Sequence, residues 1–551
     1  MSHVLREFLD SYYRLRPVNA TFTGLHDYDH RLPDWSPDGL SAAAAEMTAV
    51  RTSLDARSPL AASLHDVHER DRQLAISFLD VQLAEYESGH FVQSNPSLAV
   101  GEAAFAVIAL MTRPFASAAV RTAAAIDRLA AVAGFLSGVR RSLTKGTPDE
   151  WKKKCLRECH GVDALLDSGI DRWIAADAID EVSGKRLRRA ADAARAGFDD
   201  FQRWLTKDCP AAPASRCACG ADLFDLLLTR GHWSNASRNT LFADASDALD
   251  QALHSLNDRA ARADGWPAAQ QRLAAAHPAT NDYLDEYQRI WTNCRQRALD
   301  VDLVTWPDAP IRYVPIPVQT REAAPYLYYL FYRSPAPFDR LQVHDYVVTP
   351  VDASMERDEQ ERRLRATNTS VIKLNHVVHH GAIGHHVQNA HAYAGPSAIG
   401  QIAAVDCASR IGMFLGGTMA EGWACYATDL MDEIGFLTRD ESLAQQHTRA
   451  RLLARAVADI GLHDGRLTFD DVTAIYRDRI GMSQEAARAE ACKNSMFPGT
   501  ALMYWLGTDG LHRLRDERKR AEGSAFSLRR FHDCVLSFGS IPVPLVAQLW
   551  P

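Results

Sequence analysis

Long alanine-rich segments with a helical repeat of apolar residues run through the first half of this 551-residue chain. In residues 123–143 and 184–205, apolar side chains return every three or four positions, which is the period of an amphipathic α-helix. This pattern predicts a mainly helical fold. We expect one domain over residues 1–551, in which residues 1–210 form a mostly helical scaffold half and residues 211–551 form the half that carries the chemistry. The stretch CPAAPASRCACG, residues 209–220, is the best candidate for an internal loop or hinge.

Strand signals are confined to the middle of the chain. Residues 311–318 (IRYVPIPV) and 342–352 (QVHDYVVTPVD) are rich in β-branched and aromatic residues, and their prolines suit edge positions. We therefore expect a small β-sheet beside the histidine-rich segment that follows.

Composition and charge narrow the classes of partner. A net charge of -8 argues against nucleic-acid binding, which depends on clusters of Lys and Arg. The most basic run, RLRDERKR, is mixed in sign and is typical of a solvated helix face. Residues 1–17 alternate charged and apolar side chains without an apolar core, so we expect neither a signal peptide nor a membrane anchor, and a cytoplasmic location.

The ten cysteines have irregular spacing. This spacing favours free, mostly buried thiols over a disulfide framework. Cys155, Cys159 and His160 form one possible metal-binding group, and Cys217 with Cys219 forms another. Neither group has the paired C-x-x-C halves of a structural zinc site, so both are weak candidates.

The segment HVVHHGAIGHHVQNAHAY, residues 376–393, holds six of the 21 histidines. Histidines three or four residues apart share one face of a helix and can hold one Zn²⁺. His379 and His385 are six apart, so an ideal helix would point their side chains in different directions. They can converge only if the helix is bent or broken at Gly381 or Gly384, since glycine permits such a break.

The same segment resembles the H-E-x-x-P-G-H-H-x-Q signature of the bacterial family named domain of unknown function 885, which is generally regarded as zinc-peptidase-like. Further resemblance lies in residues 8–40, in EGWACYATDLMDEIG (residues 421–435), and in the C-terminal stretches 497–515 and 526–546. The resemblance covers the whole chain. It implies a zincin-like helical scaffold with a deep cleft.

Residue by residue, the resemblance implies that His379 and His385 are the first and second metal ligands and Glu421 the third. His386 is the alternative to His385. Two imidazoles and a carboxylate suit Zn²⁺ and leave a fourth position for water or substrate.

Two further positions match the C-terminal motifs of the family. Tyr504 and His532 fall where a side chain could face the cleft and donate a hydrogen bond to an oxyanion. The alternative is a buried tyrosine and a histidine that caps a helix.

The chain also departs from the family pattern. His380 replaces the Glu that acts as general base, and Ile383 replaces the motif proline. Lys493 and Asn494 stand where the family tends toward an Arg-Tyr pair, and Thr500 replaces a Gln. We expect Lys493, Asn494 and Thr500 to contact substrate. Loss of a general base typically costs about 10² to 10⁴ in rate, so ordinary peptidase chemistry is not expected.

Three roles are open for His380. It can be a proton-transfer group near neutral pH. It can be an additional ligand with His376 and His379, which would favour iron or manganese over zinc. Alternatively, the protein has lost catalysis and only binds.

These observations predict a metal-dependent, hydrolase-like enzyme. The expected metal is zinc, with iron or manganese as alternatives. The expected substrate is a small amino-acid-derived or amide-containing molecule, with no nucleic acid and no membrane as partner. The alternative reactions are those of a lyase or another tailoring enzyme of specialised metabolism, and the alternative to an enzyme is an inactive binding protein.

Overall fold

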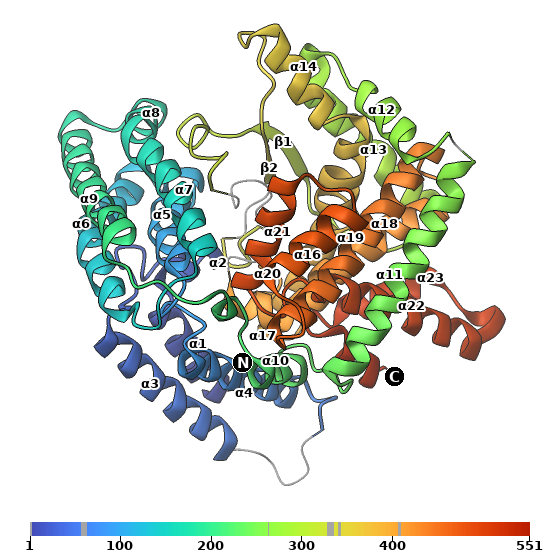
Figure 1. The fold of residues 1–551 in the computed structure, drawn as a ribbon, viewed down its shortest axis with the longest axis horizontal. Coiled ribbons are helices and arrows are strands. Elements are labelled where there is room, and N and C mark those ends of the chain that lie inside the picture. The colour runs from blue at the N-terminus through green and yellow to red at the C-terminus, as the bar shows by residue number, and fades with distance from the viewer. Residues whose placement is uncertain are drawn as a thin grey trace. The chain divides into compact units, whose positions relative to one another are not determined.

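The computed structural model describes residues 3–56, 63–262, 264–327, 335–339, 343–405 and 409–550. Within these residues the fold is mainly helical with one small sheet, so the predicted fold class is confirmed at this level (Figure 1). The chain divides into two compact units. Unit 1 comprises Met1–Leu223, Ile316–Phe331 and Ala336–Arg340, and unit 2 comprises Phe224–Pro315, Tyr332–Pro335 and Leu341–Pro551. The expected single family-type domain stays a prediction.

Unit 1 is built from helices. In chain order they are α1 (His3–Leu15), α2 (Pro17–Thr23), α3 (Pro37–Ala56), α4 (Val67–Ser88), α5 (Pro96–Thr112), α6 (Ala118–Ser142), α7 (Asp149–Ala164), η1 (Leu165–Gly169), α8 (Ile170–Ala176), α9 (Glu181–Lys207) and η2 (Ala214–Cys217); α10 (Ala221–Leu226) crosses into unit 2.

The two alanine-rich segments form α6 and α9, which pack against each other. Both helices begin a few residues before the apolar repeat does, because a polar N-cap sets the start. The side chain of Ser117 accepts the N–H of Val120, and that of Asp180 accepts two N–H groups of α9. Within the described residues, α6 is the one helix long and apolar enough to cross a membrane, and 56% of its apolar window is buried.

Unit 2 contains the remaining elements. These are η3 (Leu227–Gly231), α11 (Arg238–Ala261), α12 (Trp266–Ala275), η4 (Thr280–Asp282), α13 (Tyr283–Asp300), β1 (Ile311–Pro315), β2 (His344–Val348), α14 (Arg357–Ala366), α15 (Thr369–Val371), η6 (Ile372–Gly381), α16 (His385–Ala394), α17 (Ala398–Ile402), η7 (Gly412–Gly416), α18 (Gly417–Glu433), α19 (Arg439–His463), α20 (Phe469–Ala474), η8 (Ile475–Arg479), α21 (Gln484–Met496), α22 (Met503–Glu522), η9 (Gly523–Ala525), α23 (Leu528–Ser537) and α24 (Val543–Gln548).

The predicted sheet is present as a parallel pair, β1 and β2, in which Tyr313 pairs with Tyr346. Gln342, which begins the second predicted strand segment, lies outside the described residues. The strands lie beside α13 (Figure 1). The hydroxyl of Tyr346 is 2.8 Å from Nδ1 of His376, so the sheet adjoins the histidine-rich segment as expected.

Helix α18 forms the centre of unit 2, and all but three of its residues are buried. It packs closely on α22 at a glycine pair. A Cβ on residue 422 would lie 2.6 Å from the Cα of Gly507, so only glycine allows this approach. The approach places the N-terminal half of α18, including Glu421, inside the unit.

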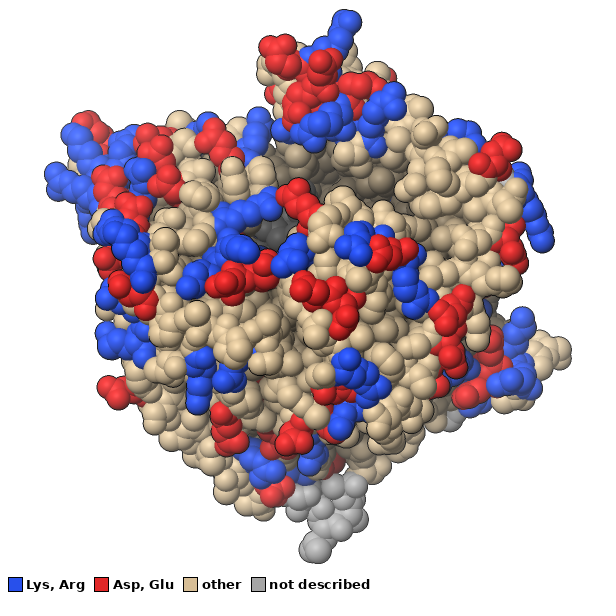
Figure 2. Space-filling view, in the orientation of Figure 1, with Lys and Arg blue, Asp and Glu red and all other residues tan. Residues whose placement is uncertain are grey.

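Charged side chains of both signs are interspersed over the face shown in Figure 2. On α14, Arg362 and Arg363 pair with Glu359, and Arg365 pairs with Glu361, each over three or four residues. Pairing of this kind neutralises basic side chains locally.

Candidate metal centre

The histidine-rich segment folds as two helical pieces separated by a short turn. The π-helical segment η6 ends at Gly381, and α16 begins at His385. π-Helical segments are rare and recur at functional sites. A Cβ on residue 384 would lie 1.9 Å from the carbonyl oxygen of His379, so only glycine fits there. This turn is what brings His379 and His385 face to face.

Two tryptophan indoles hold the turn in place. Nε1 of Trp423 in α18 donates to the carbonyl of Ile383 at 2.8 Å, and Nε1 of Trp291 in α13 donates to the carbonyl of Gly381 at 2.9 Å. The turn is therefore fixed to α18 on one side and to α13 on the other.

Four side chains meet at the turn. His379, His380 and His385 each offer a ring nitrogen, and these nitrogens lie within 4.8 Å of one another. Nε2 of His379 and Nε2 of His385 are each 3.4 Å from the same oxygen, Oε2 of Glu421. Two ligand atoms held at 2.0–2.1 Å on one tetrahedral metal lie about 3.3 Å apart. All four side chains are suitable donors for a divalent metal, and the two distances to Glu421 match the spacing of ligands on one ion.

The charge states also suit a metal. Burial alone would raise the pKa of Glu421, but His385 and His379 outweigh it and hold that pKa well below its usual range. Burial, together with His379 and His385, lowers the pKa of His380 well below its usual value. The site thus presents a carboxylate and, at His380, a neutral imidazole.

Cys425 is a neighbour of the site that the sequence analysis did not select. Its Sγ is 4.0 Å from Nδ1 of His379, and burial raises the pKa of its thiol. It stands four residues after Glu421 on α18, and this helical spacing was the available signal.

His386 points away from the cluster. Its ring nitrogen Nε2 donates to the carbonyl of Ala309 at 2.7 Å, and its ring stacks on His344. Of the two candidates for the second ligand, the structure brings His385 to Glu421.

His532 also has other partners. Its Nδ1 donates to the carbonyl of Leu303 at 2.6 Å, and its Nε2 pairs with the hydroxyl of Tyr426 at 2.9 Å. The side chain is fully buried, and burial lowers its pKa to about 4. Both ring nitrogens are thus engaged in the core of unit 2.

Tyr504 and Lys493 lie near a partly buried ion pair between Arg455 and Glu490. The guanidinium of Arg455 lies 5.2 Å from the centre of the Tyr504 ring. Burial would raise the pKa of Glu490, but Arg455 and then Lys493 lower it to about 2.

Asn494 and Thr500 make local contacts. The side-chain amide of Asn494 donates to the hydroxyl of Tyr476, and the main-chain carbonyl of Asn494 pairs with Nε2 of His463 at 3.1 Å. The Thr500 hydroxyl donates to the carbonyl of Phe497 at 2.7 Å. Contact of Lys493, Asn494 or Thr500 with substrate stays a prediction.

The weak cysteine candidates do not form a comparable group among the described residues. Cys155 and Cys159 are buried in α7, and burial followed by a hydrogen bond with Cys159 raises the pKa of Cys155 well above its usual value. Nine cysteines of the described part of the chain are not paired in disulfides, and Cys407 lies outside it.

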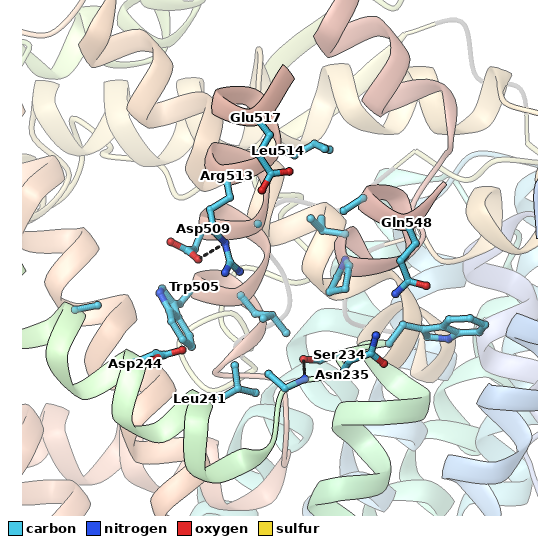
Figure 3. A pocket seen from close by; sticks show the side chains of 18 of the residues that line it. Ser234, Asn235, Leu241, Asp244, Trp505, Asp509, Arg513, Leu514, Glu517 and Gln548 are labelled. Carbon is cyan, nitrogen blue, oxygen red and sulfur yellow. Dashed lines mark hydrogen bonds and ion pairs between the residues drawn. The ribbon is translucent and has the colours of Figure 1, made fainter. Parts of the chain in front are cut away.

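A separate hollow of about 610 Å³ lies in unit 2 among α11, α22 and α24 (Figure 3). Trp505 and Asp244 line it, and Arg513 and Asp509 form an ion pair at 3.0 Å on its wall. None of its lining residues is a histidine or cysteine, so it offers no equivalent of the histidine cluster.

Comparison with known proteins gives the family. The sequence profile of the family described as "Bacterial protein of unknown function (DUF885)" matches residues 17–549. The chain belongs to this family. No curated protein matches the chain.

Two solved structures share the DUF885 chain's fold. A protein described as a "putative lipoprotein of unknown function" from Shewanella oneidensis is 19% identical, with a TM-score of 0.76 over 99% of this chain and 98% of that one. A "putative lipoprotein" from Colwellia psychrerythraea is 16% identical, with a TM-score of 0.74 over 99% and 97%. At these identities the likeness concerns the fold alone.

Proposed function

We propose that this DUF885 protein is a metal-dependent, hydrolase-like enzyme on a zincin-like scaffold, acting on a small amino-acid-derived or amide-containing molecule. The observation that carries the proposal is the convergence of two Nε2 atoms, from His379 and His385, on one oxygen of the buried Glu421 at 3.4 Å each. Ionisable groups that converge in a buried place, with one carboxylate kept ionised, are typical of functional sites.

Each side chain of the cluster has a role in the proposed reaction. His379, His385 and Glu421 hold the metal, which the family resemblance implies to be zinc and for which iron and manganese are alternatives. A divalent metal held there supplies Lewis-acid chemistry and a water of lowered pKa. His380 stands where the family has its general base, and its Nδ1–H donates to the carbonyl of Asn375 at 2.7 Å, so its lone pair is on Nε2.

A second candidate function is that of a lyase or another tailoring enzyme of specialised metabolism. The observation that favours it is His380 itself, because a neutral imidazole at the base position alters the chemistry inherited from a peptidase-like family.

The proposal includes a small-molecule substrate and a cytoplasmic location. The alternative location is the cell envelope, because two fold relatives are each described as a "putative lipoprotein". Fractionation of cells that produce the protein, with detection by antibody, distinguishes the two locations.

The test of the proposal is metal content compared between two glutamate variants of α18. Glu433 lies on the same helix as Glu421, is 47% exposed and pairs with Arg515, so Glu433→Ala is a matched control. We expect about one transition metal per chain in the unchanged protein and in Glu433→Ala, and its loss in Glu421→Ala. In Glu421→Ala, turnover of N-acyl amino acids, aminoacyl amides or dipeptides should be lost together with the metal, and in Glu433→Ala it should be kept.

Two results would overturn the proposal. One is a purified protein that binds no divalent metal, which would support a binding protein. The other is a Glu421→Ala variant that keeps both its metal and its turnover.

A further inference from the structure

The three histidine rings of the cluster have the spacing of ligands on a single metal. Their ring centres are separated by 4.7 Å (His379 to His380), 4.9 Å (His379 to His385) and 5.2 Å (His380 to His385). Imidazoles bound to one metal at 2.0–2.1 Å have ring centres about 4.6 Å apart at right angles and about 5.3 Å apart at the tetrahedral angle. All three separations fall within this interval.

The hydrogen bond of His380 orients its ring as it would be in a ligand. The carbonyl of Asn375 can only accept, so Nδ1 of His380 carries the proton and Nε2 carries the lone pair. Metal-ligating histidines almost always donate their other N–H to a carbonyl, carboxylate or water.

A proton-transfer role would place His380 differently. A base that takes a proton from a metal-bound water stands about 2.6–3.2 Å from that water, which is one molecule further out than a ligand. The ring of His380 is instead as near to His379 and His385 as these two are to each other, within half an ångström.

The geometry points to His380 as a fourth metal ligand, which completes a centre of three imidazoles and one carboxylate that suits Fe²⁺ or Mn²⁺ better than Zn²⁺. This inference rests on the metal site of the proposed function. Catalytic zinc usually takes three protein ligands and keeps one position open, so four protein ligands would close a tetrahedral zinc site. Six-coordinate Fe²⁺ or Mn²⁺ keeps two positions for substrate with the same four ligands.

The nearby thiol does not change this ligand set. Cys425 approaches Nδ1 of His379, on the side of the ring opposite the Nε2 that faces Glu421. A centre without thiolate agrees with Fe²⁺ or Mn²⁺, which are served by nitrogen and oxygen donors.

The test compares variants of two histidines from the same segment. His391 is partly exposed and its Nε2 donates to the carbonyl of Thr305 at 2.9 Å, away from the cluster, so His391→Ala is the control. The full-length protein is stripped with a chelator and titrated separately with Mn²⁺, Zn²⁺ and, without oxygen, Fe²⁺. X-ray absorption of the Mn²⁺ form counts the imidazole ligands.

We expect the Kd for Mn²⁺ to rise at least about tenfold in both His380→Ala and His380→Gln and to stay unchanged in His391→Ala. The imidazole count should fall from three to two in the His380 variants. Circular dichroism shows whether each variant is folded, and Gln keeps side-chain volume where Ala does not.

The outcomes separate this inference from the proposed function. If the protein binds metal but folded His380 variants keep the affinity and the imidazole count, His380 is not a ligand and only this inference fails. If all four side chains bind Zn²⁺ in a tetrahedral site, in preference to Mn²⁺ and Fe²⁺, the metal preference is wrong. If no divalent metal binds at all, the proposed function fails as well.

Discussion

At the scale of single residues, Gly384 determines the geometry of the candidate site, because it allows the turn that brings His379 and His385 together. It has no chemistry of its own, yet the carbonyl of His379 occupies the place where its Cβ would stand. Its N–H donates to the carbonyl of Val378 at 2.9 Å, which closes the turn after η6. Any side chain at residue 384 must push the end of η6 away from α16, and His379 moves with it.

We therefore expect Gly384→Ala to lose metal and to lower the free energy of unfolding by about 2–3 kcal/mol, as strained or overpacked core substitutions do. The control is Gly101→Ala in α5, where a Cβ meets no atom within 4 Å. That substitution should leave metal content unchanged and stabilise the protein by about 0.5–1 kcal/mol. Urea unfolding and elemental analysis of both variants measure these effects, and equal metal content in the two would contradict the role of the turn.

At the scale of elements, α18 carries both a proposed metal ligand and a side chain that holds the turn, within one and a half helical turns. Glu421 faces the histidines, Cys425 follows it on the same face, and Trp423 reaches across to the carbonyl of Ile383. Ligand and turn are thus attached to the same rigid element, which is how precise metal sites are supported.

Trp423→Phe tests this attachment. Phe keeps an aromatic ring but loses the Nε1–H that donates to Ile383 and part of the buried indole volume, so we expect at least about 1–2 kcal/mol less stability. Because the turn before His385 loses its attachment to α18, we also expect a metal affinity about tenfold weaker. The control is Trp505→Phe on α22, since Trp505 lines the separate hollow of Figure 3. Metal titration of both variants gives the answer; unchanged affinity in Trp423→Phe would mean that the turn holds without this bond.

The same elements show what the sequence could and could not predict. The helices of unit 1 and the strand pair followed from the period of apolar residues and from β-branched content, which are local properties. The break near Gly384 followed from glycine at a place where two histidines have to converge. The bond from Trp423 to Ile383 could not be foreseen, because its partners are 40 residues apart and only the packing of α18 on the turn brings them together.

The sequence was equally unable to orient side chains within its motifs. His532 and Asn494 occupy motif positions, but which way a motif residue faces depends on distant partners. For His532 these are Leu303 and Tyr426, and for the side chain of Asn494 it is Tyr476.

At the scale of the whole molecule, the chain leaves unit 1 at Leu223 and returns to it with residues 316–331 and 336–340. Ion pairs attach these later segments to the helices of unit 1. Glu322 pairs with Arg172, and Asp339 with His26 at 2.8 Å. Burial alone would lower the pKa of His26, but hydrogen bonds with Asp29 and Asp339 outweigh it and raise the pKa to about 9. The partners in the pairs Arg172–Glu322 and His26–Asp339 are more than 100 residues apart in sequence, so no local pattern predicts them.

Because the chain divides into two units, we expect bound metal to stabilise one unit more than the other. All four proposed ligands lie in unit 2, on η6, α16 and α18. A metal that binds only the folded site stabilises the folded unit by about 2.7 kcal/mol when its concentration is 100 times its Kd. Because opening of a protein occurs in local cooperative units, saturation with Mn²⁺ should slow amide hydrogen exchange strongly in residues 372–394 and 417–433. Exchange in α6 and α9 of unit 1 should change little. In the Glu421→Ala variant, measured by mass spectrometry under the same conditions, Mn²⁺ should no longer slow exchange.

Two outcomes would contradict this prediction. Equal protection of α6 and α9 would show that both units open together. Slowing that persists in Glu421→Ala would place the bound metal away from the histidine cluster.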